Sequence, residues 1–187
     1  MTQTATQVST WTLDTAHSQV EFGVKHMMFT TVKGQFRDFG AQLVLNEENP
    51  NESTVEVTIA SASVDTAVTD RDNHLRSPDF FDAASHPKLT FRSTRIEGAT
   101  LREGERFKVY GELSIRGVTH EIALDTTYDG RGRDPYGQEK VAFTAEGKLD
   151  RHDFGLTWNQ ALETGGVLVG RDVKLTITAQ FVRASAE

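Results

Sequence analysis

The chain has 187 residues, of which 37% are hydrophobic and 25% are charged, an ordinary composition for a domain with a sizeable buried core. Its formal net charge is −7, and it contains no cysteine. The acidic balance argues against nucleic-acid binding, which needs a basic face to neutralise phosphates. The lack of cysteine excludes disulfides, thiolate catalysis and iron–sulfur clusters.

The first ten residues are polar and rich in Thr and Gln, with no apolar stretch of the signal-peptide kind. We therefore expect residues 1–10 to form a flexible tail. No apolar run approaches the roughly 18–20 residues that a transmembrane helix needs. The sequence predicts a cytoplasmic protein that does not span a membrane.

Apolar and polar residues alternate along most of the chain, which is typical of half-buried strands. The alternating segments are residues 19–25, 32–45, 54–59, 88–92, 107–115, 122–124, 141–149 and 173–181. Within residues 32–45 the apolar positions change parity near Asp38, which predicts a bulge or a bend. Turn-forming residues separate the segments at 46–51, 103–105, 116–117 and 129–137.

Residues 70–87 do not alternate. They begin with the polar run Asp70–Arg76, which has an acidic start and is followed by Pro78. This pattern predicts a short helix that ends before the proline.

The chain shows no internal repeat and no linker, so we expect one all-β domain over residues 11–183 and a short C-terminal tail over residues 184–187. Several alternating segments run for about ten residues, longer than the usual five or six. Long strands in an eight-stranded closed sheet form a deep tube just wide enough for one ligand. We therefore predict a single antiparallel eight-stranded barrel with a short helical insertion.

The interior of such a barrel can be filled or partly vacant. Gly111, Ala145 and Gly147 lie in the inward-facing stripes and lower the side-chain volume there. The usual role of glycine in a strand is curvature or close backbone approach, and small barrels are usually packed by their own side chains. The alternation of apolar and polar residues alone does not distinguish a filled interior from a partly vacant one.

Six motifs follow one another along the chain, namely His17–His26, Val32–Phe39, Arg71–Asp82, His86–Phe91, Gly111–Thr119 and Asp150–Leu156. In this order and at these intervals, from about Trp11 to Phe181, the chain resembles the YceI-like family of lipocalin-like, polyisoprenoid-binding proteins. The resemblance implies a lipocalin-like barrel whose lumen holds a polyisoprenoid, an isoprenoid quinone or a similar amphiphile, with no required cofactor. Many members of this family act in the periplasm, which is the alternative to the cytoplasm.

The candidate lipid-binding residues are apolar side chains of the inward-facing stripes and of the segments near the barrel ends. Each CH₂ group removed from water contributes about 0.8 kcal/mol, so several isoprene units supply an ample driving force. Phe80 and Phe81 are adjacent, so in an extended segment only one of them would reach the lumen. The expected lining comprises Phe22, Val24, Phe36, Phe39, Phe80, Phe81, Phe91, Val109, Leu113, Ile115, Phe143, Phe154, Leu156, Trp158 and Leu168.

Polar side chains near the barrel ends are candidates for contacts with a lipid head group. His17, His26, Arg71, His74 and Arg76 can face an anionic or quinone head group at the mouth. Alternatively, they satisfy backbone groups or fix the helical insertion. No histidine cluster has metal-ligand spacing, and we assign neither catalytic residues nor a metal site.

Three functions follow from these observations. The first is a non-catalytic carrier of a long apolar lipid, with that lipid as its partner and a homodimer as a further expectation. The second is an enzyme acting on a lipid or quinone, which would need a convergent acid–base pair in the lumen. The third is a partner-binding stress protein whose barrel is filled, and a cavity too small for an aliphatic chain would favour it.

Overall fold

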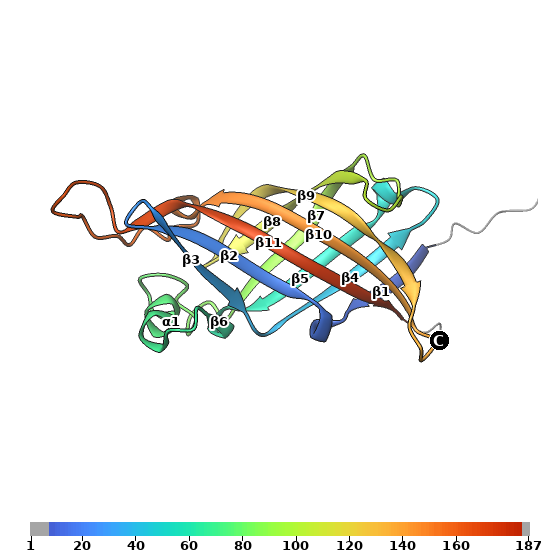
Figure 1. The fold of residues 1–187 in the computed structure, drawn as a ribbon, viewed down its shortest axis with the longest axis horizontal. Helices are drawn as coiled ribbons and strands as arrows, with labels where there is room; N and C mark the ends of the chain where they lie inside the picture. Colours follow the sequence, from blue (N-terminus) through green and yellow to red (C-terminus); the bar gives the residue numbers. More distant parts are fainter. Residues whose placement is uncertain (1–7, 185–187) are drawn as a thin grey trace, which may run out of the picture.

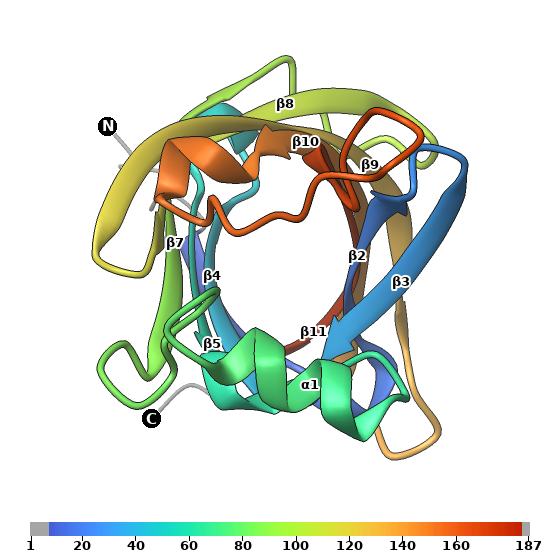
Figure 2. The same ribbon diagram turned by 90° about the vertical axis from the view of Figure 1, so that its left-hand side faces the viewer.

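A computed structural model describes residues 8–184, and within them eleven strands form one sheet that curls around a lumen (Figures 1 and 2). The strands are β1 (Val8–Leu13), β2 (Gln19–His26), β3 (Thr30–Phe36), β4 (Phe39–Asn46), β5 (Thr54–Ala60), β6 (Val64–Asp65), β7 (Lys88–Glu97), β8 (Arg106–Ile115), β9 (Val118–Arg133), β10 (Glu139–Asp150) and β11 (Val169–Arg183). One α-helix, α1 (Thr69–Arg76), and four short 3₁₀ segments complete the described part: η1 (Thr15–His17), η2 (Pro50–Glu52), η3 (Ser61–Ser63) and η4 (Arg151–Phe154).

Eight strands close the ring, in the order β1-β4-β5-β7-β8-β9-β10-β11, because β1 pairs with both β4 and β11. The pairings around this ring are antiparallel. This confirms the predicted single antiparallel eight-stranded barrel. The helix α1 covers Thr69–Arg76, within one residue of the predicted helical insertion.

The strands β2, β3 and β6 extend the barrel wall at one end. The final residues of β11 pair with β1, and its earlier residues pair with β2, which in turn pairs with β3. β3 ends at Phe36 and β4 begins at Phe39, so the predicted bend near Asp38 is present. The bend is held by a hydrogen bond of 2.9 Å from the Ala60 amide to the Asp38 carbonyl.

Two expected boundaries need correction. β1 begins at Val8, so residues 8–10 belong to a strand and not to the tail that was expected over residues 1–10. Residues 1–7 and 185–187 lie outside the described part. The loop expected over residues 129–137 is mostly strand, since β9 continues to Arg133 and β10 starts at Glu139. Tyr128 pairs with Phe143 and Gly130 pairs with Ala142, so Asp129 is a bulge in a continuing strand.

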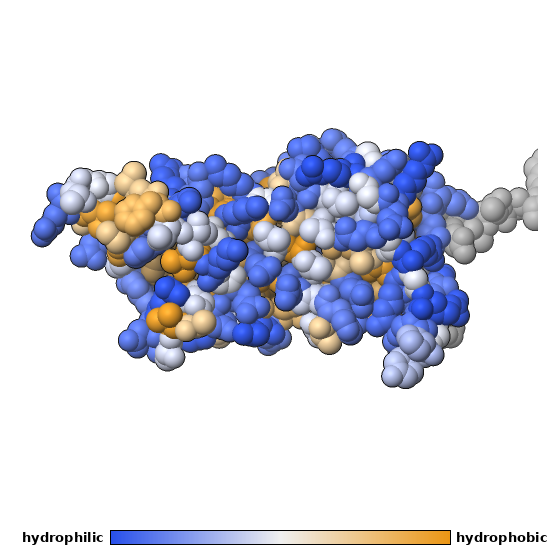
Figure 3. Space-filling view, in the orientation of Figure 1, coloured by the Kyte–Doolittle hydropathy of each residue, from blue (hydrophilic) through white to orange (hydrophobic). Residues whose placement is uncertain are grey.

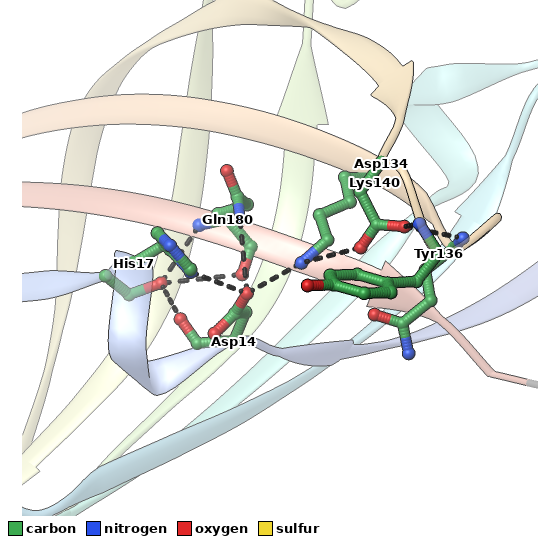
Figure 4. A network of polar contacts seen from close by, with 8 residues as sticks. Asp14, His17, Asp134, Tyr136, Lys140 and Gln180 are labelled. Atoms are coloured by element: carbon green, nitrogen blue, oxygen red, sulfur yellow. Dashed lines mark hydrogen bonds and ion pairs between the residues drawn. The ribbon is translucent and has the colours of Figure 1, made fainter.

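A polar network joins the strands where β11 changes partner (Figure 4). Asp14 follows β1, and its Oδ2 atom accepts hydrogen bonds from Lys140 Nζ (3.0 Å) on β10 and from Gln180 Nε2 (3.2 Å) on β11. His17 Nδ1 lies 2.9 Å from the same oxygen. The network therefore ties the β1–β2 junction to both neighbouring strands and holds the ring closed.

At the end of the barrel opposite α1 (Figure 1), a cluster of buried side chains covers the lumen. Trp11 is fully buried there, and the guanidinium groups of Arg131 and Arg183 each lie 5.9 Å from its ring centre. The two cations are paired, Arg131 with Glu47 (3.0 Å) and Arg183 with Glu139 (2.7 Å). Trp11 forms a buried cluster with Leu43, Leu45, Tyr128, Val141 and Phe181.

The helix α1 lies along one edge of the other end of the barrel (Figure 2). Asp72 is its buried residue, and Asp72 Oδ1 accepts hydrogen bonds from the amide (2.8 Å) and hydroxyl (2.6 Å) of Thr66. Arg76 donates to the carbonyls of Ala62 (2.7 Å) and Val64 (2.9 Å). These bonds anchor both halves of the helix to the segment that contains η3 and β6.

Candidate functional site

The barrel encloses a cavity of about 650 Å³. Its walls extend from Leu45 and Leu101 at the covered end to Trp158, which packs against His74 of α1, and Leu168, which is next to the β2–β3 turn. Many inward-facing apolar side chains, such as Val57 on β5, are only partly buried although they point into the barrel, because they face vacant space. The volume falls within the roughly 300–1,000 Å³ of small-molecule sites, so the barrel interior is partly vacant, which argues against the filled-barrel alternative.

Glycines in the barrel wall let aromatic rings approach the backbone closely. The ring of Phe22 covers Gly34 on the neighbouring strand, and the ring of Phe91 covers Gly111 in the same way. A Cβ atom at either glycine would overlap the ring. Gly111 therefore serves close approach, its usual role in strands, and by doing so it keeps the ring out of the centre of the lumen.

The fifteen residues predicted to line the lumen all border this cavity. Their role as lipid contacts stays a prediction. One detail differs from expectation: both Phe80 and Phe81 border the cavity. The segment is a turn, in which the Phe80 amide bonds the Ser77 carbonyl (3.0 Å) and the Phe81 amide bonds the Leu75 carbonyl (2.9 Å), so the alternation of an extended chain does not apply.

Aromatic side chains from three segments meet at the mouth beside α1. The ring of His74 on α1 packs edge-on against Trp158 (centroids 4.6 Å apart) and against Phe80 (5.1 Å). His74 Nε2 also lies 2.8 Å from Asp79 Oδ2. The cluster joins the helix to the segment between η4 and β11, so it narrows the mouth.

The five predicted head-group residues divide into two sets. His26, Arg71 and His74 border the cavity at the mouth. Arg71 donates to the hydroxyl (2.7 Å) and carbonyl (2.9 Å) of Thr66, which orients its guanidinium group there.

His17 and Arg76 do not border the cavity, and this corrects their expected placement. His17 lies on η1 at the side of the barrel, where it is paired with Asp14. Arg76 is committed to the backbone carbonyls that anchor α1. For these two residues the structural alternative, the fixing of local backbone, describes what the side chains do.

A buried cation at the mouth was missed by sequence reasoning. Arg151 on η4 is only 4% exposed and borders the cavity. It donates to the carbonyls of Leu156 (2.6 Å), Gly170 (2.8 Å) and Trp158 (2.9 Å), and burial lowers its pKa from the ordinary value. The only sequence signal was its place in the Asp150–Leu156 motif. Arg151 thus holds the segment that carries Trp158 and Leu168.

The distribution of polar groups along the cavity is uneven. The middle of the lumen is lined mainly by aliphatic and aromatic side chains, whereas Asp70, Arg71, His74 and Arg151 stand at the mouth. Such a site can bind the apolar part of an amphiphile by dispersion and dehydration and leave its polar end among charged and hydrogen-bonding groups. Within residues 8–184, no helix has the length and apolar character needed to cross a bilayer.

The sequence is similar to those of known proteins. The family model described as YceI-like domain matches residues 11–181. A UPF0312 protein of Staphylococcus epidermidis is 38% identical over 169 residues, which cover 90% of this chain and 94% of the relative.

Two solved structures share the fold. The YCEI protein of Campylobacter jejuni superimposes with a TM-score of 0.72 at 32% identity, covering 99% of this chain and all of that protein. A polyisoprenoid-binding domain from Saccharophagus degradans superimposes with a TM-score of 0.70 at 14% identity, covering 93% of this chain and 98% of that domain.

Proposed function

Because the chain belongs to the YceI-like family, we propose that it binds one long apolar lipid of the polyisoprenoid class in its barrel lumen, without changing the lipid chemically. The observation that carries this proposal is the cavity of about 650 Å³ with its apolar wall. The Saccharophagus degradans domain, which has the same fold, is described as polyisoprenoid-binding, and this supports the choice of lipid class.

The cavity volume sets the length of chain that fits. A water molecule takes up about 30 Å³ in the liquid and a methylene group is of similar size, so the cavity corresponds to about 20 such groups. A prenyl chain of about four isoprene units would fill it. Because dispersion contacts read shape and length, we expect little discrimination between prenyl chains of equal length.

The polar end of the lipid would stay at the mouth. Arg71, His26 and His74 border the cavity there, and guanidinium and imidazole groups suit phosphate or quinone oxygens. An isoprenoid quinone or a prenyl phosphate therefore fits the site from tail to head. No cofactor is needed for such binding.

The first experiment identifies the bound lipid. Organic extract of freshly purified protein is analysed by mass spectrometry, and delipidated protein is then titrated with geranylgeraniol and with menaquinone-4. We expect a prenyl lipid at about one per chain and saturable binding of both probes. Absence of a bound lipid together with failure to bind either probe would refute the proposal.

A pair of variants on β5 tests whether the lumen is the site. Val57 borders the cavity, and the next residue, Thr58, is exposed on the outer face. Val57→Trp should fill part of the lumen and weaken probe binding by at least about tenfold, the effect of losing burial of one large apolar group. Thr58→Trp should leave binding unchanged. Equal affinities in the two variants would place the site elsewhere.

The enzyme alternative makes a different prediction from the carrier. If the protein acts on a lipid or quinone, a probe incubated with it changes mass over time. We expect probes recovered from the protein to be unaltered. Conversion that is faster with the wild type than with Val57→Trp would favour the enzyme.

A further inference from the structure

The tight turn between β2 and β3 carries exposed apolar residues in a conformation that suits other residue types. Met27 and Met28 have φ values of 49° and 70°, and the Phe29 amide bonds the His26 carbonyl (3.3 Å). Two positive φ values at the centre of a hairpin turn are the pattern of a type I′ turn, which strongly favours Asn-Gly. A side chain in this region is strained, so stability alone does not account for two methionines here.

The same turn contains the most exposed large apolar side chains at this end of the molecule. Met28 is 65% exposed and Phe29 is 71% exposed. Val167 is also exposed and lies next to the turn, since the Met27 amide bonds the Leu168 carbonyl (2.9 Å). Figure 3 shows apolar surface gathered at this end of the molecule. We call Met27, Met28, Phe29 and Val167 the apolar tip.

The apolar tip adjoins the mouth of the cavity. Leu168 and His26 border the cavity and are the chain neighbours of Val167 and Met27. Across the mouth, Val68 before α1 is exposed as well. Exposed apolar surface therefore stands on both sides of the opening.

The segments that form the apolar tip carry very little charge, although one residue in four of the whole chain is charged. Residues 27–32 contain no charged residue. In residues 154–170 the only charged residue is Glu163. Behind the tip, Lys25 and Lys33 are exposed and lie on one face of the hairpin. Within the described residues neither lysine makes an ion pair.

We propose that the apolar tip docks into the surface of a phospholipid bilayer and presents the cavity mouth to it. At about 3.3 Å per strand residue, Lys25 and Lys33 lie roughly 7–13 Å behind the tip. Interfacial protein segments insert about 5–10 Å, so the lysines would reach the phosphate groups when the tip is inserted. The proposal rests on the proposed function, because docking at the mouth lets a prenyl lipid pass between bilayer and lumen without crossing water.

A second copy of the chain is a less suitable occupant. A stable protein interface takes about 20–30 residues from each partner. The apolar tip is four residues on two thin loops, and the adjoining β2–β3 hairpin carries two lysines without ion-pair partners among residues 8–184. A bilayer surface can take up a small apolar wedge and bind the two lysines through its phosphate groups.

The test measures flotation of the protein with vesicles of phosphatidylcholine mixed with phosphatidylglycerol. We expect the wild type to float, and Met28→Glu/Phe29→Glu to lose at least about tenfold in partition, as expected for the loss of large buried apolar groups. Tyr136→Glu is the matched control, because Tyr136 is 91% exposed in the β9–β10 turn at the opposite end. Equal partition of wild type and the double variant, or an equal loss in the control, would overturn the proposal.

A second variant separates docking from folding. Met27→Asn/Met28→Gly gives the turn its favoured residues, so we expect its melting temperature to rise by about 2–4 °C while vesicle binding falls. A variant that is as stable as wild type or more so and still floats as well as wild type would contradict the proposal. Self-association that depends on Phe29, without flotation, would assign the tip to a second copy and also overturn it.

Failure of bilayer docking and failure of lipid binding in the lumen can be told apart, because different variants test them. Both tip variants should bind geranylgeraniol added in solution with wild-type affinity, because they leave the lumen unchanged. Val57→Trp should float like wild type yet fail to bind the probe. Lys25→Gln/Lys33→Gln should lose only the preference for vesicles that contain phosphatidylglycerol over those of phosphatidylcholine alone.

Discussion

Lys140 Nζ on β10 lies 3.0 Å from Oδ2 of Asp14, which follows β1, and this ion pair bridges β11 at the point where that strand changes partner. The hydrogen bond from Lys140 is the largest cause that lowers the pKa of Asp14 to about 2, with further hydrogen bonds from His17 and Gln180. Burial opposes the shift but does not cancel it. The ionised carboxylate is therefore a component of the folded barrel.

This pair predicts a specific loss of stability in acid. Because the pKa of Asp14 is lower in the folded chain, its contribution is complete above the ordinary value of 3.8 and is lost as the pH falls towards about 2. Asp14→Asn should lower the free energy of unfolding at neutral pH by about 1–2 kcal/mol and flatten the dependence between these pH values. Urea denaturation at a series of pH values measures both effects.

Asp172→Asn provides the control for this prediction. The ion pair of Asp172 with Lys148 has both side chains more than 60% exposed, and exposed pairs contribute little. Its removal should change stability much less than Asp14→Asn. If the two variants had the same pH dependence, the role of Asp14 in closing the ring would be wrong.

Arg151 predicts a coupling between the mouth segment and the barrel. Arg151→Met keeps the length of the side chain but leaves the carbonyls of Leu156, Trp158 and Gly170 without their donor. Since a buried group without a partner costs about 1–3 kcal/mol, we expect a stability loss of at least about 2 kcal/mol. Hydrogen exchange should show faster exchange in residues 155–170 than in β8 or β9. Uniform exchange would show that the segment is held by other contacts.

Gly34 predicts how the shape of the wall controls binding. In Gly34→Ala the new methyl group would overlap the ring of Phe22, which must then tilt into the lumen. We expect weaker binding of geranylgeraniol, by about threefold to tenfold, together with a modest loss of stability. Gly40→Ala is the control, since nothing lies within 4 Å of the added atom. Unchanged affinity in folded Gly34→Ala would show that the ring does not border the bound chain.

The length of the cavity predicts a limit to chain-length dependence. Geraniol, farnesol and geranylgeraniol differ by one isoprene unit each, and every added CH₂ group that is buried contributes about 0.8 kcal/mol. Affinity should rise steeply through this series, and solanesol should gain little over geranylgeraniol because its extra units lie outside. A continued rise to solanesol would indicate a lumen that widens on binding.

The alternation of apolar and polar residues predicted most of the barrel because each strand has one face towards the lumen and one towards water. It missed β1 as a whole, because Val8–Leu13 lies before the first alternating segment and Ser9 looks like part of a polar tail. Ser9 is only 8% exposed, because its hydroxyl accepts a hydrogen bond from Trp11 Nε1 (2.8 Å). Likewise Asp129-Gly130 has the composition of a hairpin turn, yet the strand pairing continues past it.

The apolar wall of the site was predictable for the same reason as the strands, whereas its polar rim was not. The partners of Arg151 and Arg76 are backbone carbonyls, which every residue type provides, so no pairing pattern in the sequence marks them. The place of His17 depends on Asp14, Lys140 and Gln180, which only the closed ring brings together. The neighbours of these side chains are set by the closed fold and not by the adjacent sequence.

The burial of Trp11 at the far end has a kinetic consequence. In a barrel covered at one end, a competing lipid cannot enter from behind the bound lipid. The bound lipid must therefore dissociate completely before the next one can bind. Replacement would then proceed at the rate of spontaneous release, whatever the concentration of competitor. The residence time of the bound lipid would lengthen with each further carbon atom inside the barrel, so the barrel would set the rate of lipid release as well as its affinity.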